Sequence, residues 1–190
     1  MTTVEVQIRG IAPLLQNNRL GSEEQIKGGD GRRRKTAGAS NNTEEWKGKL
    51  YKDDQGKLVH PTSAIEKCLE LSAREFKADK RRTMRDVIKA CVFAEKPFAR
   101  INKAVESPDF IHECPFVNPN TKGSGIRYRP AFKEGWTMDF KLNVMDEEAV
   151  PVERLKEIFD FGGARIGIGD WRPKYGRFLV SKFEFHNGNK

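Results

Sequence analysis

Cysteine is scarce in this sequence, and long apolar runs are missing from it. The three cysteines form no CxxC pair and have apolar neighbours, which predicts reduced core residues and argues against a zinc site. No stretch approaches the roughly 18 consecutive apolar residues that a membrane span requires. The opening residues, MTTVEVQIRG, carry charges and predict no secretory signal. We therefore expect a cytoplasmic protein with no membrane segment.

The motifs that mark common catalytic and cofactor sites are also missing. The sequence has no GxSxG, no P-loop, no HExxH and no paired-carboxylate motif on a helix. Motifs of these kinds position a nucleophile, a phosphate or a metal. We expect no cofactor and no bound metal, and the absences favour a binding protein over an enzyme.

Basic residues outnumber acidic ones and gather in three places. The 190 residues fit one domain, 1–190, with a formal net charge of +8. Residues 27–35, 74–89 and 165–182 each carry a net charge of +4, so the remaining chain is net −4. Such a distribution predicts a surface, assembled by folding, that binds nucleic-acid phosphates. Solvated faces that keep the protein soluble are the alternative. The predicted phosphate contacts are Arg32, Arg33, Arg34, Lys35, Lys80, Arg81, Arg82, Arg127, Arg129, Arg165, Arg172, Lys174 and Arg177.

Hydrophobic periodicity predicts six main elements. Alternating apolar residues indicate strands, a Ser63–Glu66 capping box opens the first helix, and Gly162-Gly163 ends the second. The alternation of the last strand shifts midway, which predicts a β-bulge. The elements are strand 4–11, helix 63–77, strand 125–132, strand 136–145, helix 152–161 and strand 177–185. This order predicts an α+β protein with a ferredoxin-like (RRM-like) βαββαβ core, an antiparallel sheet with two helices on one face. Two insertions, at about 17–60 and 78–124, complete it, and the first contains a mobile basic loop.

The densest motif is the glycine-rich stretch 162–178, GGARIGIGDWRPKYGRF. Glycines allow positive φ and close approach of a ligand to the backbone, here at Gly163, Gly167, Gly169 and Gly176. Flat rings can stack on unpaired bases, and the candidates are Trp171, Tyr175 and Tyr128. The alternative is a plain turn, and for Trp171 we favour a core position. A dinucleotide-binding fingerprint is excluded, because this loop follows a helix and opens a strand.

Three segments resemble the RAMP superfamily (repeat-associated mysterious proteins), which supplies RNA-binding subunits of CRISPR effector complexes. They are LYKDDQGKLVHPTSAIEKCLELSA, VEVQIRGIAPLL and GGARIGIGDWRPKYGRFLVSKFE. The sequence departs from the usual Pro-Gly-Ser-Ser at residues 60–63, which read His-Pro-Thr-Ser. The resemblance implies a subunit that coats single-stranded RNA or DNA, with head-to-tail copies or other subunits in one complex. A viral, mobile-element or stand-alone relative fits equally well.

Three functional hypotheses follow. The first is a binding protein whose loops and helix ends contact single-stranded nucleic acid; WTMDFKLNV lacks the aromatic signature of an ordinary RRM. The second, implied by the resemblance, is a metal- or histidine-dependent endoribonuclease that uses Asp30 or His60. The third is a viral structural or interaction protein with a basic docking surface.

Overall fold

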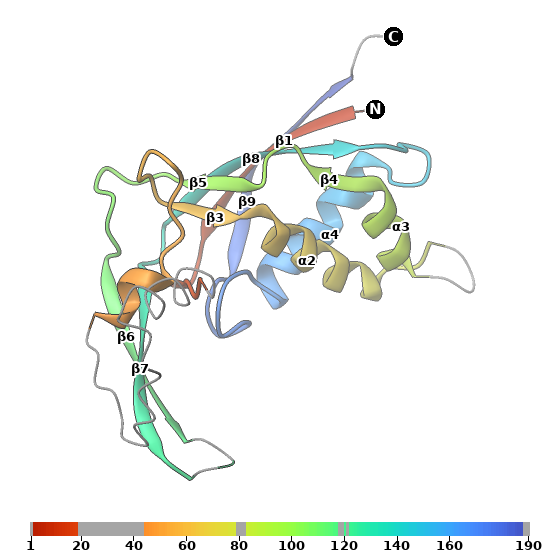
Figure 1. The fold of residues 1–190 in the computed structure, drawn as a ribbon. Helices are drawn as coiled ribbons and strands as arrows, with labels where there is room; N and C mark the ends of the chain where they lie inside the picture. The colour runs from red at the N-terminus through yellow and green to blue at the C-terminus, as the bar shows by residue number, and fades with distance from the viewer. Residues whose placement is uncertain (1, 19–43, 79–82, 118–119, 121, 188–190) are drawn as a thin grey trace.

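The computed structural model describes residues 2–18, 44–78, 83–117, 120 and 122–187 (Figure 1). Two sheets and a layer of helices make up this part of the chain. In order, the elements are β1 (Thr2–Gly10), β2 (Leu14–Leu15), η1 (Glu45–Lys49), β3 (Val59–Pro61), α2 (Thr62–Ser72), η2 (Ala73–Glu75), α3 (Met84–Cys91), β4 (Val92–Ala94), β5 (Phe98–Ile101), β6 (Phe110–Val117), β7 (Ser124–Phe132), β8 (Thr137–Val144), α4 (Val152–Arg165) and β9 (Phe178–Asn187).

The main sheet has the strand order β3-β5-β8-β1-β9, and β4 also pairs with β8. Every pairing in it is antiparallel. Alternate residues of β1 (Val4, Val6 and Ile8) are almost completely buried, because successive side chains of a strand point to opposite faces. The strands predicted at 4–11, 136–145 and 177–185 therefore share one antiparallel sheet, as expected.

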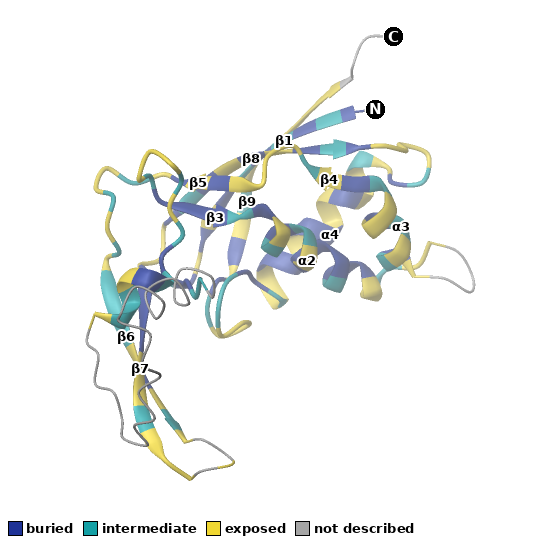
Figure 2. Cartoon of the chain, in the orientation of Figure 1, coloured by how far each residue is buried: buried dark blue, intermediate teal, exposed yellow. Residues whose placement is uncertain are grey.

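Helices α2 and α4 cover one face of this sheet (Figures 1 and 2). Leu155, Ile158 and Phe159 of α4 are buried in the core. The two helices pack closely, since a Cβ on Gly162 would lie only 2.4 Å from the Ser72 hydroxyl. This arrangement of helices on an antiparallel sheet confirms the α+β class and the ferredoxin-like core.

None of the helices in the described part of the chain is long and apolar enough to span a membrane.

The capping box predicted for the first helix is wrong. Helix α2 begins at Thr62 after Pro61 and has no side-chain cap hydrogen bond. Glu66 instead accepts a hydrogen bond from the backbone N–H of Ala94, at 2.8 Å. The first turn of α2 therefore keeps its N–H groups free of side-chain caps.

The β-bulge predicted in the last strand is present. Gln7 of β1 pairs with Lys182 and Ile8 pairs with Val180, so one residue of β9 is extra. That residue is Ser181, whose hydroxyl donates to the Gln7 carbonyl at 3.2 Å. A bulge of this kind lets Val180 and Phe183 both face the core despite their odd spacing.

The strand predicted at 125–132 forms, but it lies outside the main sheet. It is β7, which pairs with β6 and β2 in a second, three-stranded sheet. The β6–β7 hairpin extends away from the main sheet (Figure 1). The place expected for this strand beside β8 is taken by β4 and β5. These strands have only three and four residues, too few for alternation to show.

Candidate nucleic-acid interface

Several of the predicted site residues lie outside the described residues. They are Asp30, Arg32, Arg33, Arg34, Lys35, Lys80, Arg81 and Arg82. Their predicted roles, and the mobility predicted for the first insertion, stay predictions.

The glycines of the loop between α4 and β9 (the Gly-rich loop, residues 166–177) serve the packing of the chain on itself. Gly169 has a φ of 81°, and a Cβ there would lie 2.6 Å from the Leu15 carbonyl oxygen. Gly176 has a φ of 72°, and a Cβ there would lie 1.7 Å from the carbonyl oxygen of Ile168. L-residues disfavour such positive φ values, and no side chain fits either space. Gly163 and Gly167 are similarly close to neighbouring backbone atoms.

The backbone donors of this loop are also engaged. The N–H of Asp170 bonds to the Leu15 carbonyl at 2.9 Å, and that of Gly176 to the Pro13 carbonyl at 2.8 Å. The N–H of Ile168 bonds to the carbonyl of Gly176 at 2.9 Å. The loop is therefore anchored on the segment after β1, and these N–H groups are not offered to a ligand.

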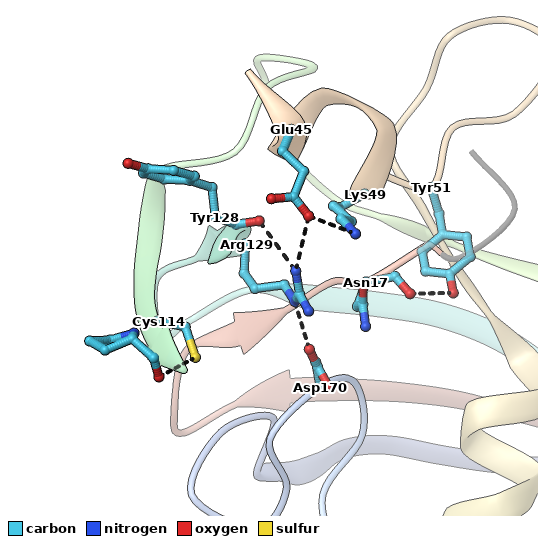
Figure 3. A network of polar contacts seen from close by, with 9 residues as sticks. Asn17, Glu45, Lys49, Tyr51, Cys114, Tyr128, Arg129 and Asp170 are labelled. Carbon is cyan, nitrogen blue, oxygen red and sulfur yellow. Dashed lines mark hydrogen bonds and ion pairs between the residues drawn. The ribbon is translucent and has the colours of Figure 1, made fainter. Parts of the chain in front are cut away.

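Arg129 lies in a buried polar network and is not a free cation (Figure 3). Its side chain donates from Nε to the Asp170 carboxylate at 2.9 Å, and a guanidinium nitrogen lies 4.0 Å from the Glu45 carboxylate. The residue is only 6% exposed. Because its charge is neutralised inside the protein, the prediction that Arg129 contacts phosphate is corrected. Tyr128 is buried as well, which argues against the stacking role predicted for its ring.

Trp171 is exposed, contrary to the core position that we favoured. It is 44% exposed, and its backbone φ is 57°, a left-handed conformation that is rare for a bulky residue. Its ring meets His112 of β6 edge-on, with centroids 5.5 Å apart, and lies 6.2 Å from the ring of Tyr175. The ammonium of Lys174 lies 5.7 Å from the Tyr175 centroid. Two of the predicted stacking candidates, Trp171 and Tyr175, therefore lie side by side in the Gly-rich loop.

His112 is a member of this aromatic cluster that sequence reasoning missed. Its ring lies 5.2 Å from that of Tyr175, and its Nε2 is 3.4 Å from the Tyr175 hydroxyl. The residue is half-buried in an eight-residue strand. No local pattern marks it, since its partners lie about sixty residues away in the sequence.

Five of the predicted phosphate contacts are exposed and have no ion-pair partner among the residues that the structure describes. They are Arg127 on β7, Arg165 at the end of α4, and Arg172, Lys174 and Arg177 in the Gly-rich loop. The single acidic residue of this loop, Asp170, is engaged by Arg129. The loop therefore presents uncompensated positive charge beside the exposed Trp171.

A pocket of about 210 Å³ opens between the Gly-rich loop and the start of α2. Its lining consists of Asn17, Tyr51, His60, Pro61, Ala64, Gly169, Asp170 and Arg172. His60 is 2% exposed, and burial lowers the pKa of its ring to about 4. The structure thus brings His60 together with Arg172, although the two are more than a hundred residues apart in the sequence.

The sheet face opposite the helices differs in charge pattern from the loop. Glu5 at its centre pairs with Lys141 at 2.8 Å and with Lys182 at 3.7 Å. Opposite charges are interleaved here, whereas an RRM exposes aromatic rings on this face. Glu5, Glu184 and His186 come close enough to share a metal ion, but the two carboxylates bind lysines. We assign no site to this face.

Comparison with known proteins gives a likeness of fold. No protein-family model matches the sequence, and a search of curated proteins finds no match. Among solved structures, the chain is similar to one in the cryo-EM structure of the Type III-B Cmr-beta bound to cognate target RNA. The TM-score is 0.55 at 14% identity, and the match covers 97% of this chain and 60% of that one. The chain therefore spans less than two thirds of its structural neighbour, with which it shares a fold.

Proposed function

We propose that this protein is a RAMP-like subunit that binds single-stranded RNA or DNA within a nucleoprotein complex, such as a CRISPR effector. The observation that carries the proposal is the Gly-rich loop, where an exposed tryptophan is followed by exposed cations that have no ion-pair partner in the described part of the chain. Trp171, Arg172, Lys174 and Arg177 lie within seven consecutive residues. Cations of this kind bind phosphates, and an exposed ring stacks on an unpaired base.

The backbone of Trp171 supports a ligand-binding role over a purely structural one. A left-handed conformation costs a non-glycine residue roughly 1–2 kcal/mol. Because the ring is exposed, it gains only part of the burial free energy that could offset this cost. Strained positions tend to cluster at functional sites. A stacked base would cover the ring and thereby account for both features.

The likeness to a chain in the target-RNA-bound Cmr-beta structure supports the same proposal. That complex was solved with its cognate target RNA bound, and the shared fold makes RNA the first ligand to test. Head-to-tail assembly of copies along one strand is part of the proposal, because open-ended contacts between copies generate filaments.

The salt dependence of binding tests the role of the loop cations. Each neutralised phosphate of a single strand contributes about −0.7 to the slope of log affinity against log salt. Replacing Arg172, Lys174 and Arg177 with glutamine should therefore flatten the slope by about 2 units. Affinity should fall alike for unrelated sequences, since phosphates carry no sequence information.

A matched control keeps the change in net charge the same. Lys89, Lys96 and Lys156 are exposed residues outside the loop, and their replacement by glutamine should leave the slope within about half a unit of wild type. If both triple variants alter the slope equally, the protein binds through diffuse charge and the loop has no special role. Cleavage of the RNA in the presence of Mg²⁺ would favour the endoribonuclease alternative.

A further inference from the structure

The pocket between the Gly-rich loop and α2 is separate from the aromatic cluster, and four of its eight lining residues carry side-chain hydrogen-bond donors: Asn17, Tyr51, His60 and Arg172. Its volume is about 210 Å³, below the roughly 300–1,000 Å³ of pockets that hold whole small-molecule ligands. Such a pocket suits one chemical group of a longer ligand that passes over it.

The tautomer of His60 follows from its neighbour Gln16. The Gln16 side-chain oxygen accepts a hydrogen bond from the Tyr51 N–H at 3.0 Å, which fixes the orientation of the amide. The Gln16 side-chain nitrogen then donates to the Val59 carbonyl at 2.7 Å and lies 3.4 Å from Nδ1 of His60. An amide nitrogen can only donate, so Nδ1 is the acceptor and the ring proton resides on Nε2.

The Nε2–H group of His60 is an unused donor. It is shielded from solvent, and it has no hydrogen-bond partner among the described residues. Burial lowers the pKa of the ring to about 4, so the ring is neutral at pH 7 and keeps this proton. A neutral histidine in this tautomer donates a hydrogen bond from Nε2, and it cannot act there as a general base without first losing that proton.

Two further positive features converge on the same pocket. The first turn of α2 contains no acidic residue and no side-chain cap, so its dipole favours an anion. Arg172 lies on the opposite wall and is exposed. The carboxylate in the lining, Asp170, is held by Arg129 at 2.9 Å, so its charge is compensated.

We infer that this pocket receives a phosphate group, with His60 donating from Nε2 to one phosphate oxygen and Arg172 supplying the positive charge. The inference rests on the proposed function, because the phosphate is taken to be a phosphodiester of the bound single strand. It assigns His60 a binding role, distinct from the catalytic one considered from the sequence. A free phosphate anion offers the same chemistry, and the two sources are separable by experiment.

Nitrogen NMR of the histidine rings in the full-length wild-type protein tests the inference without a mutation. Before ligand is added, His60 should show the neutral form with its proton on Nε2. Adding a short oligouridylate should shift the His60 Nε2–H resonance, and inorganic phosphate should do so more weakly. His186, which lies outside the pocket and is exposed, serves as the internal control and should respond only to ionic strength.

Two variants add a measurement of affinity. His60→Phe keeps a ring in the pocket but removes the donor, and it should weaken oligouridylate binding roughly tenfold or more, as for a hydrogen bond to a charged group. Arg172→Gln should raise the phosphate concentration needed to shift the His60 resonance. Circular dichroism checks that both variants fold, and the wild-type NMR titration decides the question if His60→Phe does not.

The outcomes separate this inference from the proposed function. If oligouridylate binds with a steep salt dependence while the His60 resonance stays still, the pocket is not a phosphate subsite, although nucleic-acid binding stands. If inorganic phosphate alone shifts the resonance and oligouridylate binds without shifting it, the assignment to the strand is wrong. If oligouridylate does not bind at all, the proposed function fails and the inference fails with it.

Discussion

Replacing Trp171 with glycine should weaken nucleic-acid binding far more than it weakens the fold. The residue is 44% exposed with a φ of 57°, and its ring contacts His112 and Tyr175 at centroid distances of 5.5 Å and 6.2 Å. Glycine removes the ring but adopts this backbone conformation without strain. The substitution therefore separates the contribution of the ring from that of the backbone.

The expected magnitudes follow from these contacts. Loss of two aromatic pairs removes about 0.5–1.5 kcal/mol each, and relief of the left-handed conformation returns roughly 1–2 kcal/mol. Trp171→Gly should thus lie within about 2 kcal/mol of wild-type stability, against roughly 3–5 kcal/mol for a truncated core tryptophan. Loss of a stacked base should lower the binding free energy by about 1–3 kcal/mol.

Trp171→Ala is the matched control, because alanine also lacks the ring but keeps the strained backbone. It should bind as weakly as Trp171→Gly and unfold about 1 kcal/mol more easily. Urea unfolding should be followed by circular dichroism, since the substitution removes one of the three fluorescent tryptophans. Binding is measured by the anisotropy of a labelled oligouridylate. Unchanged affinity in both variants would refute stacking. A loss of stability beyond about 3 kcal/mol in the glycine variant would show that the Trp171 ring is packed in the core and not exposed on a strained backbone.

Further predictions concern the framework of the site. Arg129→Leu should destabilise the fold by about 1–3 kcal/mol in urea unfolding by leaving Asp170 unpaired, and adding Asp170→Leu should restore part of the loss. Gly176→Ala should lower stability by at least about 2 kcal/mol, because its Cβ would meet a carbonyl oxygen in addition to the strain of positive φ. Gly135→Ala, with positive φ but open space around it, should cost only about 1 kcal/mol. Hydrogen bonds from Lys67, and then from Arg85, lower the pKa of Glu70 to about 2. The stability that Glu70 adds over Glu70→Gln should therefore be complete above about pH 4.5 and disappear as the pH falls towards 2.

The core of the fold could be predicted because its strands and helices bury one face each. Val4, Val6 and Ile8 alternate over a full strand, so the pattern identifies both the strand and the face that it buries. The short strands β4 and β5 gave no comparable signal. The sequence predicts β7 as a strand but places it in the wrong sheet, because periodicity indicates that one face is buried and does not identify the element that covers it.

The candidate site shows a similar limit. Arg127 and Arg129 belong to the same strand and look equivalent in the sequence, yet one is exposed and the other is buried. Their surroundings differ: Asp170, forty-one residues beyond Arg129, accepts a hydrogen bond from Arg129, whereas the guanidinium of Arg127 lies over the ring of Phe116, 4.2 Å from its centroid. Local sequence reports which residues are charged, and only the tertiary structure decides which charges are neutralised internally.

The same contacts join the β6–β7 hairpin to the Gly-rich loop as one surface. His112 and Arg129 are direct cross-strand neighbours in the hairpin. They contact two consecutive loop residues, since Arg129 binds Asp170 and His112 meets Trp171. A nucleobase stacked on Trp171 would therefore contact a ring that packs against His112 of the hairpin. A movement of the hairpin would also disturb the ion pair between Arg129 and Asp170. It follows that Arg127, exposed farther along β7, should act with the loop cations, so that its effect on affinity is not additive with that of Trp171.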